Sequence, residues 1–283
     1  MMQPIVVIAG LTIREAIRRK LIAACIAISL CLVGLSAWGF NRLSHSHSIT
    51  SGEVRAAIPQ ALILFMFMFS FVVALSASAM ASPAVSAEID SGVLQSIATR
   101  PISRSQIVAG KWLGLAVVLL GYATLVTGLE VAVVDWVSGF VPPNPVLVGA
   151  YLFAEGAILL TFALLLSTRL STLATGVVGI AIFGAAWLAG VVGSLGSAFN
   201  ISSLRVIGEV SRYILPTDGL WRGAIYYLEP QSFVAHEIAV SSQAANSPFF
   251  AQSPPAGTYL VWVAVWFVAV LIAGLASFER REL

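Results

Sequence analysis

Two acidic residues lie inside strongly apolar stretches of the sequence, where a carboxylate is expensive to bury. Glu130 lies toward the end of the stretch 113–134, and Glu155 lies about a third of the way into the stretch 147–166. Buried carboxylates of this kind usually face a partner group or a wet cavity. We therefore expect Glu130 and Glu155 to be candidate residues of a polar pathway. Glu155 is the stronger candidate, because it lies deeper in its apolar stretch. A structural hydrogen bond to a neighbouring helix is the alternative for Glu155.

The stretch 105–112, SQIVAGKW, resembles the end of a phosphate-binding loop of the form GxxxxGK[ST]. Such a loop needs glycine at its first position, and it needs Ser or Thr after the lysine to bind magnesium. Here Ser105 and Trp112 occupy those two positions. We therefore expect this chain to bind no nucleotide and no other cofactor. The sequence also lacks a GxSxG nucleophile motif, so no catalytic residue is predicted.

Two histidine motifs could suggest a metal, and neither has the required spacing. The stretch 236–240, HEIAV, begins like a zinc-protease helix, but Val240 replaces the second histidine that must lie one turn later. His45 and His47 lie two residues apart with no cysteine or third ligand nearby, which favours a solvated loop. We predict no metal site.

The composition indicates that the whole chain is embedded in a membrane. Of its 283 residues, 59% are hydrophobic and only 10% are charged, whereas about one quarter are charged in soluble domains. A helix needs about 20 mostly apolar residues to cross the hydrocarbon layer. Six stretches meet this requirement, which predicts an all-α polytopic membrane protein with six transmembrane helices: 21–40, 58–81, 113–134, 147–166, 173–195 and 259–277. The first stretch is too long for a cleaved signal peptide.

Basic residues orient these spans. With an even number of spans, both termini lie on one side, and that side carries ten of the 15 Lys and Arg residues: Arg14, Arg18, Arg19, Lys20, Arg100, Arg104, Lys111, Arg169, Arg280 and Arg281. Cytoplasmic loops are enriched in Lys and Arg, so we expect both termini to be cytoplasmic. The net charge of +2 is divided by the membrane and points to no nucleic-acid partner.

The N-terminal segment 4–20 has apolar residues at positions 5, 8, 11, 13 and 17 and a basic cluster behind them. This pattern predicts a helix in the inner interface that enters the first span through a bend. The alternative is that the segment is simply the charged start of a longer first span.

The polar segment after the second span is predicted to contain a short amphipathic helix. Ser82 and Pro83 mark the end of the span, and apolar residues recur at helical spacing from 85 to 97. Pro101 then biases the chain out of the helix. Ser103 is predicted to cap the next helix, which runs into the third span.

The long segment 196–258 is predicted to hold two short helices at the outer surface. Apolar residues recur in ISSLRVIGEVSRYIL (201–215), and the following PTDGLWRGAIYYLEP (216–230) has Thr217 or Asp218 as a cap and Pro230 as a stop. Charged residues prevent either helix from being an ordinary span.

The fifth span is rich in glycine, which predicts packing against another helix. At the start of the third span, Gly110 and Gly114 form one GxxxG pair, which by itself is a weak signal.

The polar segment also contains a specific motif: Glu88, three residues, Gly92-Val93-Leu94, RPISR at 100–104, and Gly110-Lys111. This motif closely resembles the cytoplasmic loop of the permease subunits of type-2 ABC exporters. The resemblance extends across nearly the whole chain, because TIREAIRRK (12–20) looks like the elbow helix of that family and FERREL (278–283) resembles its usual ending. The connector 231–258 is longer than in the plainest family members.

The resemblance implies a single transmembrane permease domain over 1–283, with elbow helix 4–20, coupling segment 83–111 and extracytoplasmic helical segment 196–258. It implies a bacterial inner membrane, two permeases, identical or homologous, that form a pathway as a dimer, and two copies of a separate ABC ATPase that binds ATP and Mg. A coupling helix would contact the ATPase through Glu88, Gly92, Val93, Leu94, Arg100, Pro101 and Arg104. The elbow residues Arg14, Arg18 and Arg19 would contact lipid headgroups or the partner.

A second function from a different class stays open on the sequence. A non-transporting membrane subunit or assembly factor within a larger complex would also span the membrane several times. A membrane enzyme or assembly factor would be expected to carry clustered polar residues in its spans, and only Glu130 and Glu155 are found there. The apolar spans favour a hydrophobic or amphiphilic cargo over a small ion.

Overall fold

The computed structural model describes residues 3–45, 51–90, 103–230, 234 and 247–280, and every regular element in this part of the chain is a helix. The elements are α1 (Gln3–Arg18), α2 (Lys20–Ser44), α3 (Ser51–Ala81), α4 (Pro83–Asp90), α6 (Arg104–Ser138), α7 (Pro145–Ser167), α8 (Thr172–Ala198), α9 (Ser202–Ile214), α10 (Thr217–Leu228) and α12 (Gly257–Glu279).

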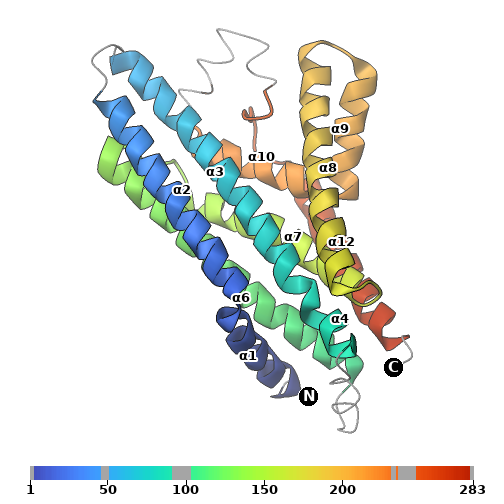
Figure 1. Ribbon diagram of the computed structural model, residues 1–283. Coiled ribbons are helices and arrows are strands. Elements are labelled where there is room, and N and C mark those ends of the chain that lie inside the picture. Colours follow the sequence, from blue (N-terminus) through green and yellow to red (C-terminus); the bar gives the residue numbers. More distant parts are fainter. Residues whose placement is uncertain (1–2, 46–50, 91–102, 231–233, 235–246, 281–283) are drawn as a thin grey trace.

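Within the described residues, six helical stretches are long and apolar enough to cross a membrane: Lys20–Ser44, Ala57–Ile89, Arg104–Ser138, Pro145–Ser167, Thr172–Ala198 and Gly257–Glu279. Each overlaps one predicted range, so the predicted all-α fold with six spans is confirmed. Figure 1 shows both termini at the same end of the molecule, as an even number of spans requires.

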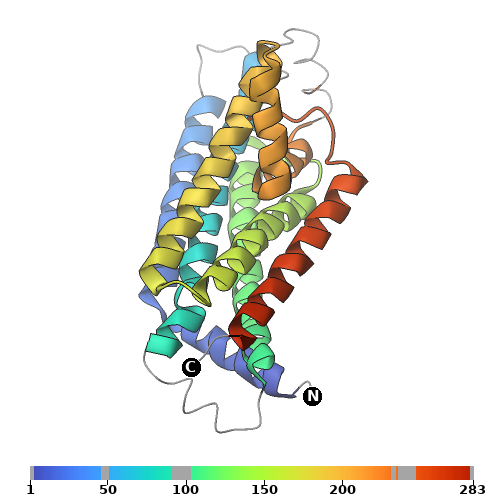
Figure 2. The same ribbon diagram turned by 90° about the vertical axis from the view of Figure 1, so that its right-hand side faces the viewer.

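Helix α3 forms the centre of the bundle and packs against α2, α6 and α7. Its side chains Leu62, Ile63, Met66 and Phe69 are fully buried. In the most apolar window of Ala57–Ile89, 67% of the residues are buried, compared with 6% for the corresponding window of α12. Figure 2 accordingly shows α12 on the outside of the bundle. Its apolar surface is therefore directed toward lipid or a partner chain.

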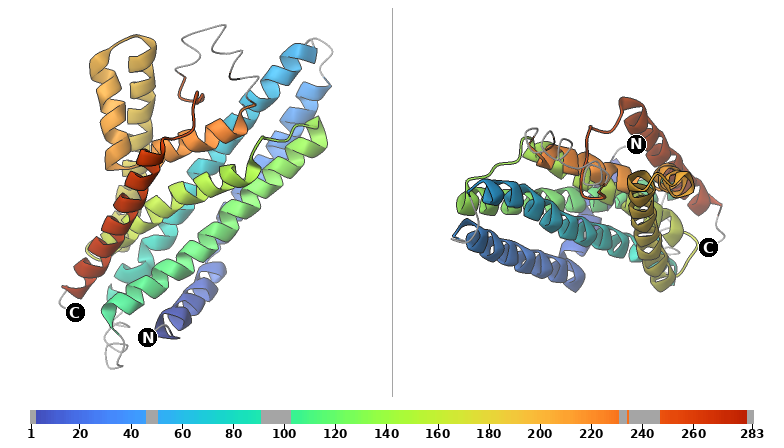
Figure 3. Two further views of the ribbon diagram at one scale, coloured as in Figure 1. Left: turned by 180° about the vertical axis from the view of Figure 1, so that it is seen from behind. Right: turned by 90° about the horizontal axis from the view of Figure 1, so that it is seen from above.

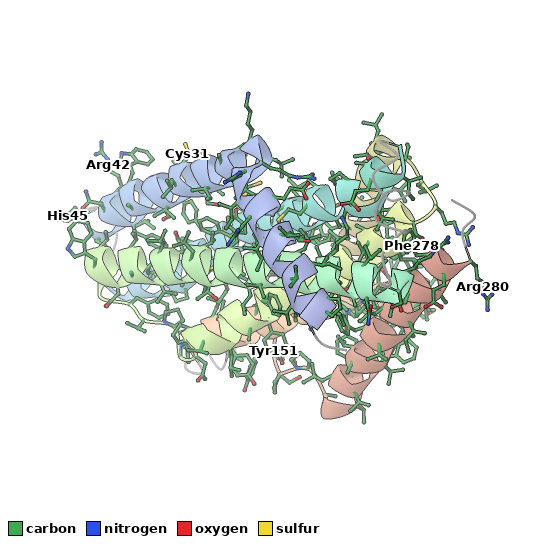
Figure 4. The ribbon with its side chains drawn as sticks, turned by 90° about the horizontal axis from the view of Figure 1, so that it is seen from below. Cys31, Arg42, His45, Tyr151, Phe278 and Arg280 are labelled. Carbon is green, nitrogen blue, oxygen red and sulfur yellow. The ribbon has the colours of Figure 1, made fainter. Side chains whose placement is uncertain are left out.

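Helix α1 is separate from α2 and lies against the first part of α6 (Figure 4). The chain bends at Arg19, whose backbone is extended with φ −73° and ψ 131°. Gly110 and Gly114 of α6 make the contact possible, because a Cβ on Gly114 would lie 2.6 Å from the carbonyl oxygen of Ala9. Gly110 and Gly114, a weak GxxxG signal in the sequence, are thus the residues of α6 against which α1 packs.

Helices α8 and α9 form an antiparallel hairpin, whose connection lies at the end of the molecule away from both termini in Figure 1. Gly193 and Gly208 face each other across the hairpin, where a Cβ on Gly193 would lie 2.7 Å from the Cα of Gly208. The predicted packing of the fifth span through small residues is therefore confirmed. Close backbone approach is what small residues permit in apolar surroundings.

Helix α10 crosses the bundle and packs on α7, as the rear view in Figure 3 shows. It ends at Leu228, before the predicted stop at Pro230. The predicted cap is wrong, because Pro216 occupies the N-cap position and Thr217 and Asp218 are the first helical residues. The Asp218 carboxylate accepts hydrogen bonds from two arginines instead of capping the helix.

Candidate functional site

An ion pair joins the two ends of the motif that runs from residue 88 to residue 111. Lys111 Nζ on α6 donates to Glu88 Oε1 on α4 at 2.5 Å and to the carbonyl oxygen of Ala84 at 2.7 Å. The Lys111 side chain is only 7% exposed. A lysine is rarely buried to this extent without such partners. The pair therefore ties the end of α4 to the beginning of α6, although 23 residues separate them in sequence.

Helix α4 is also held against the spans on either side of it. Ser86 Oγ lies 2.7 Å from Thr172 Oγ1 at the start of α8. Ala84 and Val85 are buried in the main apolar core. Because α4 follows α3 after a break at Ser82, these contacts make it a short helix supported by α3, α6 and α8.

The beginning of α6 is closed by a capping box. Ser103 Oγ accepts from the backbone N–H of Gln106, and the Gln106 side chain accepts from the backbone N–H of Ser103. The predicted cap at Ser103 is therefore confirmed. Arg104, the first helical residue, is half-buried. The other predicted coupling residues lie outside the described residues: Gly92, Val93, Leu94, Arg100 and Pro101.

A small cavity links this region to α1. It has a volume of about 200 Å³ and is lined by Thr12 and Ala16 of α1, by Arg19 at the bend after α1, and by Glu88 and Lys111 across from them. The predicted residues Arg14 and Arg18 lie on the exposed side of α1, beside the exposed apolar residues Leu11 and Ile17, whereas Arg19 forms an ion pair with Glu15. The exposed face of α1 is thus both apolar and basic.

A comparison with known families decides the class of protein. A family model described as ABC-2 family transporter protein matches residues 6–283. The chain belongs to the ABC-2 transporter family. This ABC-2 protein is therefore a multi-pass membrane component of an ABC transporter, and such components are not themselves catalytic. The family implies an ATPase partner in general. No curated protein matches the chain.

The two candidate pathway carboxylates of this ABC-2 protein each face a serine on a neighbouring helix. Ser36 of α2 donates to Glu130 Oε2, and Ser70 of α3 donates to Glu155 Oε2, both at 2.8 Å. Glu130 and Glu155 are both buried. The observed geometry is that of a hydrogen bond between helices. A role for either residue in a pathway stays a prediction.

A cluster of charged side chains in α9 and α10 was missed by sequence reasoning. Arg212 Nε and Arg222 Nε both donate to Asp218 Oδ2, at 2.7 and 3.2 Å, and Arg222 also donates to Ser194 of α8 at 2.6 Å. Burial lowers the pKa of Arg222 below its ordinary value, and the neighbouring Asp218 carboxylate opposes this effect. The spacing of Asp218 and Arg222, one helical turn apart, is the signal that could have indicated the pair.

Proposed function

We propose that this chain is the permease subunit of an ABC exporter, that it works as a dimer, and that separate ATPase subunits drive it. The observation that carries the proposal is the largely buried ion pair between Glu88 and Lys111, which ties α4 to the beginning of α6. ATP and Mg would be bound by the partner, because this chain has no phosphate-binding loop.

In this proposal a coupling helix lies within the segment 83–111 and rests on the ATPase. Movement of the ATPase subunits would shift α4, and the ion pair would pass that movement to α6 and to α1 packed on it. Such rigid-body movement about an interface is a common way to switch between two states. The contacts with the ATPase would come from Glu88, Gly92, Val93, Leu94, Arg100, Pro101 and Arg104.

We also propose that all of 1–283 acts as one permease domain in the inner membrane of a bacterium, with both termini in the cytoplasm. In that orientation Arg14 and Arg18 of α1, and Arg19 at the bend after it, lie near the inner lipid headgroups, and the segment 196–258 is extracytoplasmic. The mixed apolar and basic surface of α1 supports this placement.

The experiment that tests the proposal is purification of the chain together with an ABC ATPase from the same organism, for which a neighbouring gene is the first candidate. Gly92→Pro and the double variant Arg100→Ala, Arg104→Ala should weaken assembly with the ATPase about tenfold, the effect of about 1.4 kcal/mol of lost interface energy, and should lower the ATPase rate stimulated by the permease. Arg280→Ala, an exposed basic residue at the same end of the molecule, is the matched control and should not change the rate.

Two results would contradict the proposal. The first is an ATPase rate in the coupling variants equal to that of the control. The second is a chain that purifies without any ATPase, which would favour a non-transporting membrane subunit or assembly factor.

A further inference from the structure

A polar cavity lies where α8, α9, α10 and the beginning of α12 meet, in the half of the molecule away from both termini (Figure 1). Its volume is about 450 Å³. The lining includes Arg212, Arg222, Ser194 and Tyr259, and the segment 250–256 covers another side. The described residues of the segment 83–111, at the other end of the bundle, do not line this cavity.

The two arginines of the cavity are held in place by protein groups. Arg212 and Arg222 share the carboxylate of Asp218, and the Ser194 hydroxyl accepts from Arg222 at 2.6 Å. The Tyr259 hydroxyl donates to the carbonyl oxygen of Pro216 at 3.2 Å, which fixes the turn between α9 and α10. These contacts orient both guanidinium groups.

The arginines retain donors for another ligand. A guanidinium has five N–H donors, and the described part of the protein takes one from Arg212 and two from Arg222. The Arg212 and Arg222 side chains are 29% and 20% exposed, whereas that of Asp218 is 5% exposed. Arg212 and Arg222 line the cavity and Asp218 does not, so the arginines are the part of the cluster that a molecule in the cavity can reach.

The charge in the cavity also favours an anion. Among the groups that contact one another here, two arginines and one buried aspartate leave one positive charge, while Glu209 also lines the cavity and has an exposed side chain. A desolvated charge without a full complement of opposite charge is costly. An oxyanion on the free edges of the guanidinium groups would remove that cost through charge-assisted hydrogen bonds.

We propose that this cavity is a binding site for a phosphate-like oxyanion, held by Arg212 and Arg222. The oxyanion can be a free phosphate ion or the headgroup of an anionic lipid. The site requires neither an ATPase nor a second copy of the chain. Its failure would therefore leave the proposed export function untouched, and the reverse also holds.

The test uses the purified chain in neutral detergent, with thermal unfolding followed by tryptophan fluorescence. One arm titrates inorganic phosphate against sodium chloride at equal ionic strength. The other arm titrates short-chain phosphatidylglycerol against short-chain phosphatidylcholine. Binding to the native state raises the unfolding temperature with ligand concentration. A response to phosphate identifies a free oxyanion as the ligand, and a response to phosphatidylglycerol alone identifies a lipid headgroup; either response supports the proposal.

Variants separate this site from a general salt effect, because phosphate also stabilises folded proteins by exclusion from their surface. Arg212→Gln and Arg222→Gln should each weaken binding at least about tenfold, the effect of losing one charged hydrogen bond. Arg205→Gln, an exposed arginine on the same helix α9 as Arg212, is the matched control and should bind as the unchanged protein does.

Asp218→Asn should strengthen binding of the anion, and a poorly folded variant could not produce that result. Removal of the internal carboxylate leaves two arginines for the ligand, so binding should become several-fold tighter. Three results would overturn the proposal: no response to either probe, an equal response in the Arg212→Gln, Arg222→Gln double variant, or binding that does not tighten in folded Asp218→Asn.

Discussion

At the scale of single residues, the central feature is the contact between Glu88 and Lys111. Lys111 is almost completely buried, whereas Glu88 is 25% exposed. Removing one member of a buried ion pair costs about 3–5 kcal/mol, chiefly because the remaining charge is left buried, while replacing both members can be nearly neutral. The pair therefore contributes more to the definite position of α4 than to overall stability.

We predict that Glu88→Ala lowers the free energy of unfolding by about 3 kcal/mol, toward the lower end of that range because Glu88 is partly exposed. The double variant Glu88→Ala, Lys111→Met should recover most of this loss, since no buried charge then remains. Glu15→Ala breaks the exposed pair with Arg19 and is the control, with an expected cost below about 1 kcal/mol. Denaturation in detergent measures all three. Equal losses in Glu88→Ala and Glu15→Ala would contradict the prediction.

At the scale of elements, close helix contacts depend on glycines that meet backbone atoms. Helix α1 packs against α6 at Gly110 and Gly114, and α9 packs against α8 at Gly193. Gly121, on the same helix as Gly114, has open space where a Cβ would lie. The same residue type thus has a packing function at some positions of α6 and none at others.

We predict opposite effects of one substitution at two positions of α6. Gly114→Ala should destabilise the contact with α1 by about 1–3 kcal/mol, because the new methyl group overlaps the backbone of Ala9. Gly121→Ala should be neutral or stabilising by up to about 1 kcal/mol, because alanine favours the helix. Limited proteolysis near Arg14 and thermal unfolding report the two effects. Faster cleavage in Gly121→Ala than in Gly114→Ala would exclude this explanation.

At the scale of the whole molecule, the even number of spans places both termini together, and the connection between α8 and α9 lies at the other end (Figure 1). Asn200 lies in that connection and is exposed, and Arg280 lies beyond the end of α12 and is also exposed. The two positions therefore report opposite sides of the membrane. Cys31, which Figure 4 marks together with Arg280, is an exposed cysteine on α2. It would react with a thiol reagent and must therefore be replaced before the experiment.

We predict that Asn200→Cys, in a chain whose Cys25 and Cys31 are both replaced by alanine, reacts with an impermeant maleimide in intact cells. Arg280→Cys in the same background should react only after the membrane is permeabilised, because basic residues are retained in the cytoplasm. Labelling of Arg280→Cys in intact cells would show the reverse orientation. It would also place α4 on the side where no ATP is available.

Local physical rules made much of this protein predictable from its sequence. A backbone that crosses a bilayer must satisfy its hydrogen bonds internally, so the number of spans follows from counting apolar stretches. Ser103 could be assigned as a cap because a capping box is complete within four residues. The two short helices α9 and α10 follow from periodicity and from the proline that comes after them.

Only the tertiary structure decided which distant residues meet. The approach of Lys111 to Glu88, of Gly114 to α1, and of Asp218 to Arg212 depends on how helices pack. Helical periodicity reports which face of a helix is apolar and does not report which helix covers that face. For the same reason Asp218 resembled a cap in the sequence, although its carboxylate binds two arginines in the fold.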